Sequence, residues 1–221
     1  MRQLLYVKRK EDTRMRLTTE LTILWMNQAN DAIQEHHEYL TELDQMIGDG
    51  DHGINMARGF RAAIEHLDGR TYETPGAVLK DVTMVLLSKI GGAAGPLYAS
   101  ALLKMAVAMA DEKAVPFSLF QQAVNEAVKA LQHRGKSTEN EKTLIDVWTP
   151  FARYLSAQTD WNVEEWSDVL TEAKNKTKTM QATKGRAAYY KEKSIGHLDA
   201  GATSSYYLLM ALTDVLKEQS I

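Results

Sequence analysis

The chain contains no cysteine, and this absence excludes several kinds of chemistry. Disulfides, thiolate metal sites and a cysteine nucleophile all require that residue. No apolar run approaches the roughly 20 residues of a membrane span, and the N-terminus lacks the apolar stretch of a signal peptide. We therefore expect a soluble protein of a reducing compartment, by default the cytoplasm.

A general basic field is also missing. The net charge of −3 argues against nucleic-acid binding, because no excess of positive charge is available to release counterions from a phosphate backbone. Neither the phosphate loop Gly-x-x-x-x-Gly-Lys-Ser/Thr nor the dinucleotide glycine fingerprint is present. The expected partner is a small molecule or another protein, and the two common nucleotide-binding folds are not supported.

Strand signals are scarce, whereas helical periodicity recurs from end to end. Thr18-Thr19-Glu20 opens a long helix that runs up to an acidic loop. The further helices that we expect span residues 54–67, 75–88, 97–109, 116–133, 143–156, 163–181 and 202–218. With 44% hydrophobic residues and mostly short connections, the sequence predicts one all-α domain of antiparallel helices over residues 15–221. Residues 1–14 form a basic N-terminal extension that we expect to lie outside this domain.

The acidic loop contains Asp44, Asp49 and Asp51. Three carboxylates so close together repel one another unless a cation holds them. Oxygen ligands on a flexible loop suit Mg²⁺ or Ca²⁺ better than zinc, and the spacing does not fit an EF-hand. The alternative is a plain polar turn, because the intervening glycines also suit a tight loop.

Two glycine-containing segments precede predicted helices, at residues 91–96 and 196–205. Unpaired N–H groups and the helix dipole at such positions favour phosphate. Each segment alone is weak evidence, but together with the carboxylates they indicate a metal-bound polyphosphate. Arg186 is a candidate phosphate clamp, with a solvated loop cation as the alternative. His52, inside the acidic loop, is a candidate donor to phosphate.

The order of these motifs resembles the DhaL family, the nucleotide-binding L subunits of bacterial phosphotransferase-dependent dihydroxyacetone kinases. The resemblance covers Thr18 to about Glu218. The residues that carry it are Asp44, Gly48-Asp49-Gly50-Asp51-His52-Gly53 with Asn55, Gly91-Gly92-Ala93-Ala94-Gly95-Pro96-Leu97-Tyr98, Arg134-Gly135-Lys136, Lys142-Thr143-Leu144 with Asp146, Gly185-Arg186-Ala187 and Gly196-His197-Leu198-Asp199-Ala200-Gly201-Ala202. It implies an eight-helix antiparallel up-down barrel with the nucleotide site at one end.

The resemblance also implies a role for each site residue. Asp44, Asp49 and Asp51 would be the catalytic metal ligands, holding two Mg²⁺ ions that bridge the phosphates of ADP or ATP. The remaining nucleotide-binding residues would be His52, Asn55, Gly91, Gly92, Ala93, Ala94, Leu97, Leu144, Arg186, Asp199, Ala200 and Gly201.

The activity implied is phosphoryl transfer by a kinase subunit. DhaM would phosphorylate the tightly bound ADP, and the resulting ATP would phosphorylate dihydroxyacetone held on the partner subunit DhaK. Two alternatives stay open: a non-catalytic ADP/ATP-binding regulatory subunit that contacts a transcription factor, and a related kinase domain for another substrate. The sequence leaves self-association into a homodimer open.

Three positions depart from the family pattern. Serine is common where Ala94 stands, proline is usual where Ala200 stands, and Asn140 to Thr143 replace a Gly-Asp-Lys-Thr pattern. Because all three metal carboxylates are intact, we expect altered affinity or exchange of the nucleotide and no loss of binding.

Overall fold

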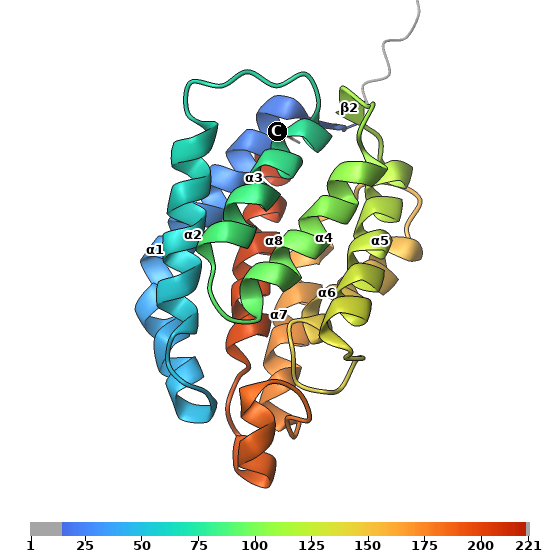
Figure 1. The fold of residues 1–221 in the computed structure, drawn as a ribbon. Coiled ribbons are helices and arrows are strands. Elements are labelled where there is room, and N and C mark those ends of the chain that lie inside the picture. The colour runs from blue at the N-terminus through green and yellow to red at the C-terminus, as the bar shows by residue number, and fades with distance from the viewer. Residues whose placement is uncertain (1–14, 220–221) are drawn as a thin grey trace, which may run out of the picture.

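The computed structural model describes residues 15–219, which form eight α-helices and two very short strands (Figure 1). The α-helices are α1 (Thr19–Ile47), α2 (His52–Leu67), α3 (Pro75–Lys89), α4 (Ala94–Ala108), α5 (Phe117–Gly135), α6 (Ile145–Ser156), α7 (Trp166–Lys176) and α8 (Ala200–Glu218). The N-terminal extension expected over residues 1–14 lies outside the described residues.

Each α-helix packs against the next one in the chain, and α8 packs against α1, so the ring of helices closes. Neighbouring helices run alternately up and down (Figure 1). The predicted all-α class is thereby confirmed, and the closed ring is the arrangement that the family resemblance implies. One consequence is that α2, α4, α6 and α8 all begin at the same end of the ring.

Local sequence explains where several helices begin. Thr18 caps α1, since its side chain accepts a hydrogen bond from the Leu21 N–H at 3.3 Å. Thr74 caps α3 in the same way at the Ala77 N–H, and Pro75 occupies the first turn, where a missing N–H does no harm. These starts agree with the predicted ones because capping depends on residues only three positions apart.

Large side chains from all parts of the ring fill its interior. Trp25, Trp148, Trp166 and Phe120 are fully buried, and the indole N–H of Trp25 donates to the Leu208 carbonyl of α8 at 2.7 Å. Burying one large apolar side chain contributes roughly 1.5–3 kcal/mol. The core therefore fixes the helix positions from which the loops at either end project. Within the described chain, no helix is both long and apolar enough to cross a membrane.

The strand pair was not predicted. β1 (Leu17–Thr18) pairs antiparallel with β2 (Ala114–Val115). Two residues per strand are too few to produce an alternating pattern, so this pair leaves no strand signal in the sequence. The pair joins the start of α1 to the connection between α4 and α5. Figure 1 labels β2 at this end of the ring.

Several element boundaries also differ from prediction. The helix predicted over residues 163–181 is divided into the 3₁₀ helix η1 (Val163–Glu165), α7 and the 3₁₀ helix η2 (Thr177–Thr179). The loop expected over residues 182–201 contains a third, η3 (Arg186–Ser194). α1 continues to Ile47, whose side chain is buried, so Asp44 lies in its last turn, at the helix C-terminus as expected.

Candidate functional site

A cavity of about 490 Å³ opens at the end of the ring where α2, α4, α6 and α8 begin. All the site residues predicted from the sequence line it: Asp44, Asp49, Asp51, His52, Asn55, Gly91, Gly92, Ala93, Ala94, Leu97, Leu144, Arg186, Asp199, Ala200 and Gly201. Helix N-termini carry partial positive charge and unpaired N–H groups. The ring therefore gathers anion-binding elements opposite the acidic loop.

The three aspartates of the acidic loop lie together. One carboxylate oxygen from each of Asp44, Asp49 and Asp51 lies within 4.8 Å of the others, and among the described residues no other group of three or more acidic, histidine or cysteine side chains meets this condition. Hard oxygen donors at this separation fit Mg²⁺ or Ca²⁺. The arrangement favours the cation interpretation over a plain polar turn.

Asp44 also shapes the loop that carries the other two aspartates. Its Oδ2 accepts hydrogen bonds from the backbone N–H groups of Asp51 at 2.9 Å and His52 at 3.2 Å. Asp44 thus caps α2, whose own N-cap residue makes no side-chain cap. Gly50 has φ +73°, and a Cβ on Gly48 would come within 2.1 Å of Asp44 Oδ1. Both glycines are therefore required by the shape of the loop.

Arg186 reaches the acidic loop from η3, which packs against α1. Its Nη1 lies 2.9 Å from Asp49 Oδ2, and the Tyr190 hydroxyl from the same 3₁₀ helix donates to the Gly48 carbonyl at 3.4 Å. The Arg186 side chain is 63% exposed, so the ion pair alone contributes little stability. Its position matters more, because it places a guanidinium with free donors beside the proposed metal ligands.

His52 belongs to a hydrogen-bonded network beneath the cavity. His52 Nε2 lies 2.8 Å from Ser204 Oγ, and the Tyr98 hydroxyl contacts Ser204 and Ser205 at 2.7 and 2.8 Å. The indole N–H of Trp148 donates to Ser205 at 3.1 Å. Burial lowers the pKa of His52, against the opposing charges of Asp44 and Asp51. The network joins α2, α4, α6 and α8 and fixes the histidine ring.

Asn55 is oriented by Arg58, which donates to Asn55 Oδ1 at 2.6 Å and to the Lys89 carbonyl at 2.9 Å. With its oxygen occupied, the amide of Asn55 keeps its N–H donors for another partner. A Cβ on Gly91 would lie 3.2 Å from that oxygen, so the glycine turn packs directly against this side chain. The arrangement presents donors at the start of α4.

The two predicted anion-binding helix starts differ. No side chain caps α4 at Ala93, whereas Asp199 caps α8 by accepting from the Ala202 N–H at 2.7 Å. Burial raises the pKa of Asp199 to about 7, and the nearby Lys142 opposes that shift. The start of α4 therefore suits phosphate better than the start of α8, where a carboxyl group already occupies an N–H.

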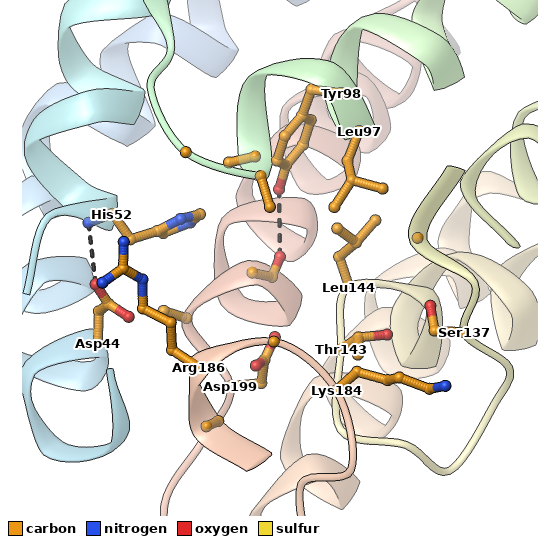
Figure 2. A pocket seen from close by; sticks show the side chains of 18 of the residues that line it. Asp44, His52, Leu97, Tyr98, Ser137, Thr143, Leu144, Lys184, Arg186 and Asp199 are labelled. Carbon is orange, nitrogen blue, oxygen red and sulfur yellow. Dashed lines mark hydrogen bonds between the residues drawn. The ribbon is translucent and has the colours of Figure 1, made fainter. Parts of the chain in front are cut away.

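The opposite side of the cavity is apolar at its centre and polar at its rim. Leu97 of α4 and Leu144 point toward each other, and Ser137, Thr143 and Lys184 lie on the side away from Asp44 and His52 (Figure 2). An apolar slot with a few polar groups suits a flat ring system. The cavity therefore has an acidic end and a slot for an aromatic group.

The loop before α6 explains one departure from the family pattern. Asn140 has φ +73°, a left-handed conformation that glycine adopts most easily and asparagine next. Its N–H and that of Thr143 both donate to the Asp146 carboxylate. Asn140 therefore preserves the loop that a glycine would form at this position.

Sequence reasoning did not assign a role to Lys142, although it stands in one of the motifs that carry the resemblance. The side chain lines the cavity but is only 1% exposed, because its ammonium turns into the protein. The feature of the sequence that points to a role for Lys142 is its position beside Thr143 and Leu144, in a motif that carries the resemblance. Its acceptors lie far away in the chain and leave no local pattern.

Together, the helical ring and the cavity define an all-α domain with an acidic cluster facing converging helix N-termini. The DAK2 domain family matches residues 46–214, and the chain belongs to this family.

Two curated relatives are similar over almost their whole length. The protein named "PTS-dependent dihydroxyacetone kinase, ADP-binding subunit DhaL" of Lactococcus lactis is 41% identical over 200 residues, covering 90% of this chain and 99% of the relative. The "PEP-dependent dihydroxyacetone kinase, ADP-binding subunit DhaL" of Escherichia coli is 36% identical, covering 92% of this chain and 100% of the relative.

Solved structures of the dihydroxyacetone kinase of C. freundii share the fold. The native form superposes with a TM-score of 0.70 at 19% identity, and the complex with AMP-PNP and Mg²⁺ with a TM-score of 0.67 at 18% identity. Each comparison covers 97% of this chain but only 38% and 37% of the solved chain, respectively. The chain thus corresponds to a part of that larger protein.

Proposed function

We propose that the chain is the ADP-binding subunit of a phosphotransferase-dependent dihydroxyacetone kinase. In this proposal it holds ADP, receives a phosphoryl group from DhaM, and passes it from ATP to dihydroxyacetone on DhaK. The observation that carries the proposal is the cluster of Asp44, Asp49 and Asp51 beside converging helix N-termini in one cavity. The similarity to DhaL subunits over nearly their full length supports it.

The acidic end of the cavity would perform the transfer. Asp44, Asp49 and Asp51 would hold two Mg²⁺ ions, which neutralise charge on a transferring phosphoryl group. Arg186 would donate to phosphate oxygens in a bidentate manner. Because burial disfavours its charged form, His52 would act as a neutral donor or acceptor, held in place by Ser204.

The uncapped start of α4 would bind phosphate through backbone N–H groups of Gly91, Gly92, Ala93 and Ala94, with Asn55 donating beside them. Leu97 and Leu144 would enclose the nucleoside, and the start of α8, from Asp199 to Gly201, would border it. A base between two leucines is stabilised by apolar burial.

The proposal places the protein in the cytoplasm, where DhaK and DhaM would be its partners. The proposal also includes a transcription factor as an additional partner and self-association into a homodimer.

Native mass spectrometry of the purified chain tests the cofactor directly. We expect one ADP with two Mg²⁺ ions to survive desalting, and we expect phosphorylated DhaM to convert that ADP to ATP. A chain that binds no nucleotide at millimolar ADP and Mg²⁺ would contradict the proposal.

The two alternatives give different results in the same assay. A regulatory subunit would retain nucleotide but would not accept phosphate from phosphorylated DhaM. A kinase domain for another substrate would consume free ATP without DhaM and would not phosphorylate dihydroxyacetone when DhaK is supplied.

A further inference from the structure

Lys142 is a buried cation that has no part in the proposed chemistry. It lies in the loop before α6 and is 1% exposed. Burial lowers the pKa of its ammonium, against the charges of Asp199 and Asp146. In the part of the chain that the structure describes, its hydrogen bonds go to carbonyl oxygens and not to either carboxylate. Because a buried charge is unfavourable unless it is well paired, these carbonyl contacts are the reason that the lysine is tolerated.

Three carbonyl oxygens saturate the ammonium. Lys142 Nζ donates to the carbonyls of Thr177 at 2.7 Å and Met180 at 3.3 Å, and also to the carbonyl of His197. Thr177 and Met180 lie at the C-terminal end of α7 and η2, where carbonyls lack partners within the helix and the dipole is negative. His197 lies just before Asp199, the cap of α8. A single ammonium thus joins the end of one helix to the start of another.

Residues 177–199 between these helices form the Arg186 segment. Lys142 holds both of its ends, and the Thr183 N–H donates to the Glu141 carbonyl, next to Lys142, at 3.2 Å. Within the segment, the Gly196 N–H donates to the Lys178 carbonyl at 2.8 Å. Since α7 does not continue into α8, these contacts hold the segment against the loop before α6.

The loop that carries Lys142 is itself fixed to α6. Asp146, 1% exposed, accepts from the N–H groups of Asn140 and Thr143 on either side of the lysine. Lys142 has φ +60°, so the backbone turns sharply where its side chain leaves the loop. The ammonium therefore has a defined position relative to the core. Its contacts with the two ends of the Arg186 segment fix that segment relative to the core as well.

We propose that Lys142 is a positioning residue for nucleotide binding, which fixes Arg186 relative to the acidic loop. This inference rests on the proposed function, because it requires that Arg186 binds phosphate. Lys142 touches no nucleotide in this proposal; it acts through Arg186. Its removal should weaken ADP binding only as far as Arg186 contributes to that binding.

A double-mutant cycle on the full-length chain tests this dependence. We expect Lys142→Met to weaken Mg²⁺-ADP binding about tenfold in isothermal titration when Arg186 is present, and less than threefold in the Arg186→Ala background. We also expect hydrogen exchange over residues 177–199 to accelerate in Lys142→Met while the helices of the core keep their protection. Multiplicative effects of the two substitutions, or unchanged exchange in the segment, would overturn the proposal.

Val82→Ala is the control for a purely structural effect, since Val82 is a fully buried residue of α3 that does not line the cavity. It should lower the melting temperature without changing the affinity for ADP. If Lys142→Met does not fold, Lys142→Gln replaces it in the cycle, because its amide retains two of the three donors. If the wild-type chain fails to bind ADP, the proposed function is overturned. Hydrogen exchange of residues 177–199 in the Lys142 variant then still decides whether Lys142 fixes the segment.

Discussion

The two walls of the cavity are built in different ways. In the wall formed by the acidic loop, Asp44 bonds to N–H groups only seven and eight residues further along the chain. In the opposite wall, Lys142 bonds to carbonyls that lie 35 and 55 residues away. The first wall is thus shaped by its own sequence, whereas the second depends on the packing of α6, α7 and α8.

The difference matches a difference in proposed task. Metal ligands must keep their mutual distances even when other parts of the chain move. A short glycine-containing loop maintains these distances. Arg186 comes instead from a segment far along the chain, so it depends on the tertiary contacts that hold this segment. We therefore expect substitutions in the first wall to act on transfer itself and substitutions in the second to act on affinity and on stability.

The largest effect is expected from Asp49→Asn in the first wall. The amide is a weaker metal ligand than the carboxylate, so phosphoryl transfer to dihydroxyacetone should fall roughly thousandfold. A reconstituted assay with DhaK and phosphorylated DhaM measures the rate. The matched control is Asp111→Asn, an exposed aspartate after α4 that lines no part of the cavity. Transfer at the wild-type rate by Asp49→Asn would remove Asp49 from the metal site.

Asp199→Asn tests the second wall through pH. In the folded chain the pKa of Asp199 is raised to about 7 from 3.8, so between these values the folded state binds more protons than the unfolded state. This contribution is therefore fully present below pH 4 and is lost as the pH rises to about 7, reducing the free energy of unfolding by roughly 2–4 kcal/mol.

The asparagine variant keeps an oxygen that caps α8 but does not titrate. Its stability should therefore lack this fall, so that the difference from wild type changes between pH 4 and pH 7 and is constant above pH 8. Urea unfolding without nucleotide or metal at several pH values measures the difference. Parallel curves for the two proteins would mean that folding does not raise the pKa of Asp199.

Arg186→Ala should weaken ADP binding about tenfold, because it removes two charge-assisted hydrogen bonds to phosphate. Arg186→Lys should recover only part of the affinity, since an ammonium does not bind in a bidentate manner. Lys193→Ala is the control, as an exposed cation of η3 beyond the kink at Lys191. Equal losses for Arg186 and Lys193 would indicate a general charge effect on the anion.

The smallest effect is expected from Ala94→Ser. Serine would restore the hydroxyl common in the family at the uncapped start of α4 and should tighten ADP binding two- to fivefold, by about 0.4–1 kcal/mol. Ala108→Ser, at the other end of the same helix, serves as the control. No gain, or an equal gain from both substitutions, would show that the hydroxyl at position 94 does not reach the phosphate.

The sequence predicted the helices well where local rules decide them. Apolar periodicity gave the eight helices, and the starts predicted at Thr18 and Pro75 are those of α1 and α3. It did not predict the β1–β2 pair or η3, since neither has a sequence pattern long enough to recognise. Asp44 was expected at the C-terminal end of the first helix and lies in the last turn of α1.

The candidate site divides in the same way. The sequence by itself brought Asp44, Asp49 and Asp51 together, since residues this close along a glycine-containing loop have little freedom to separate. Only the tertiary structure decided that Arg186 meets Asp49 and that Lys142 holds the segment between α7 and α8. These contacts join residues far apart in the chain, so their partners are fixed by how the whole ring of helices packs and not by any local pattern.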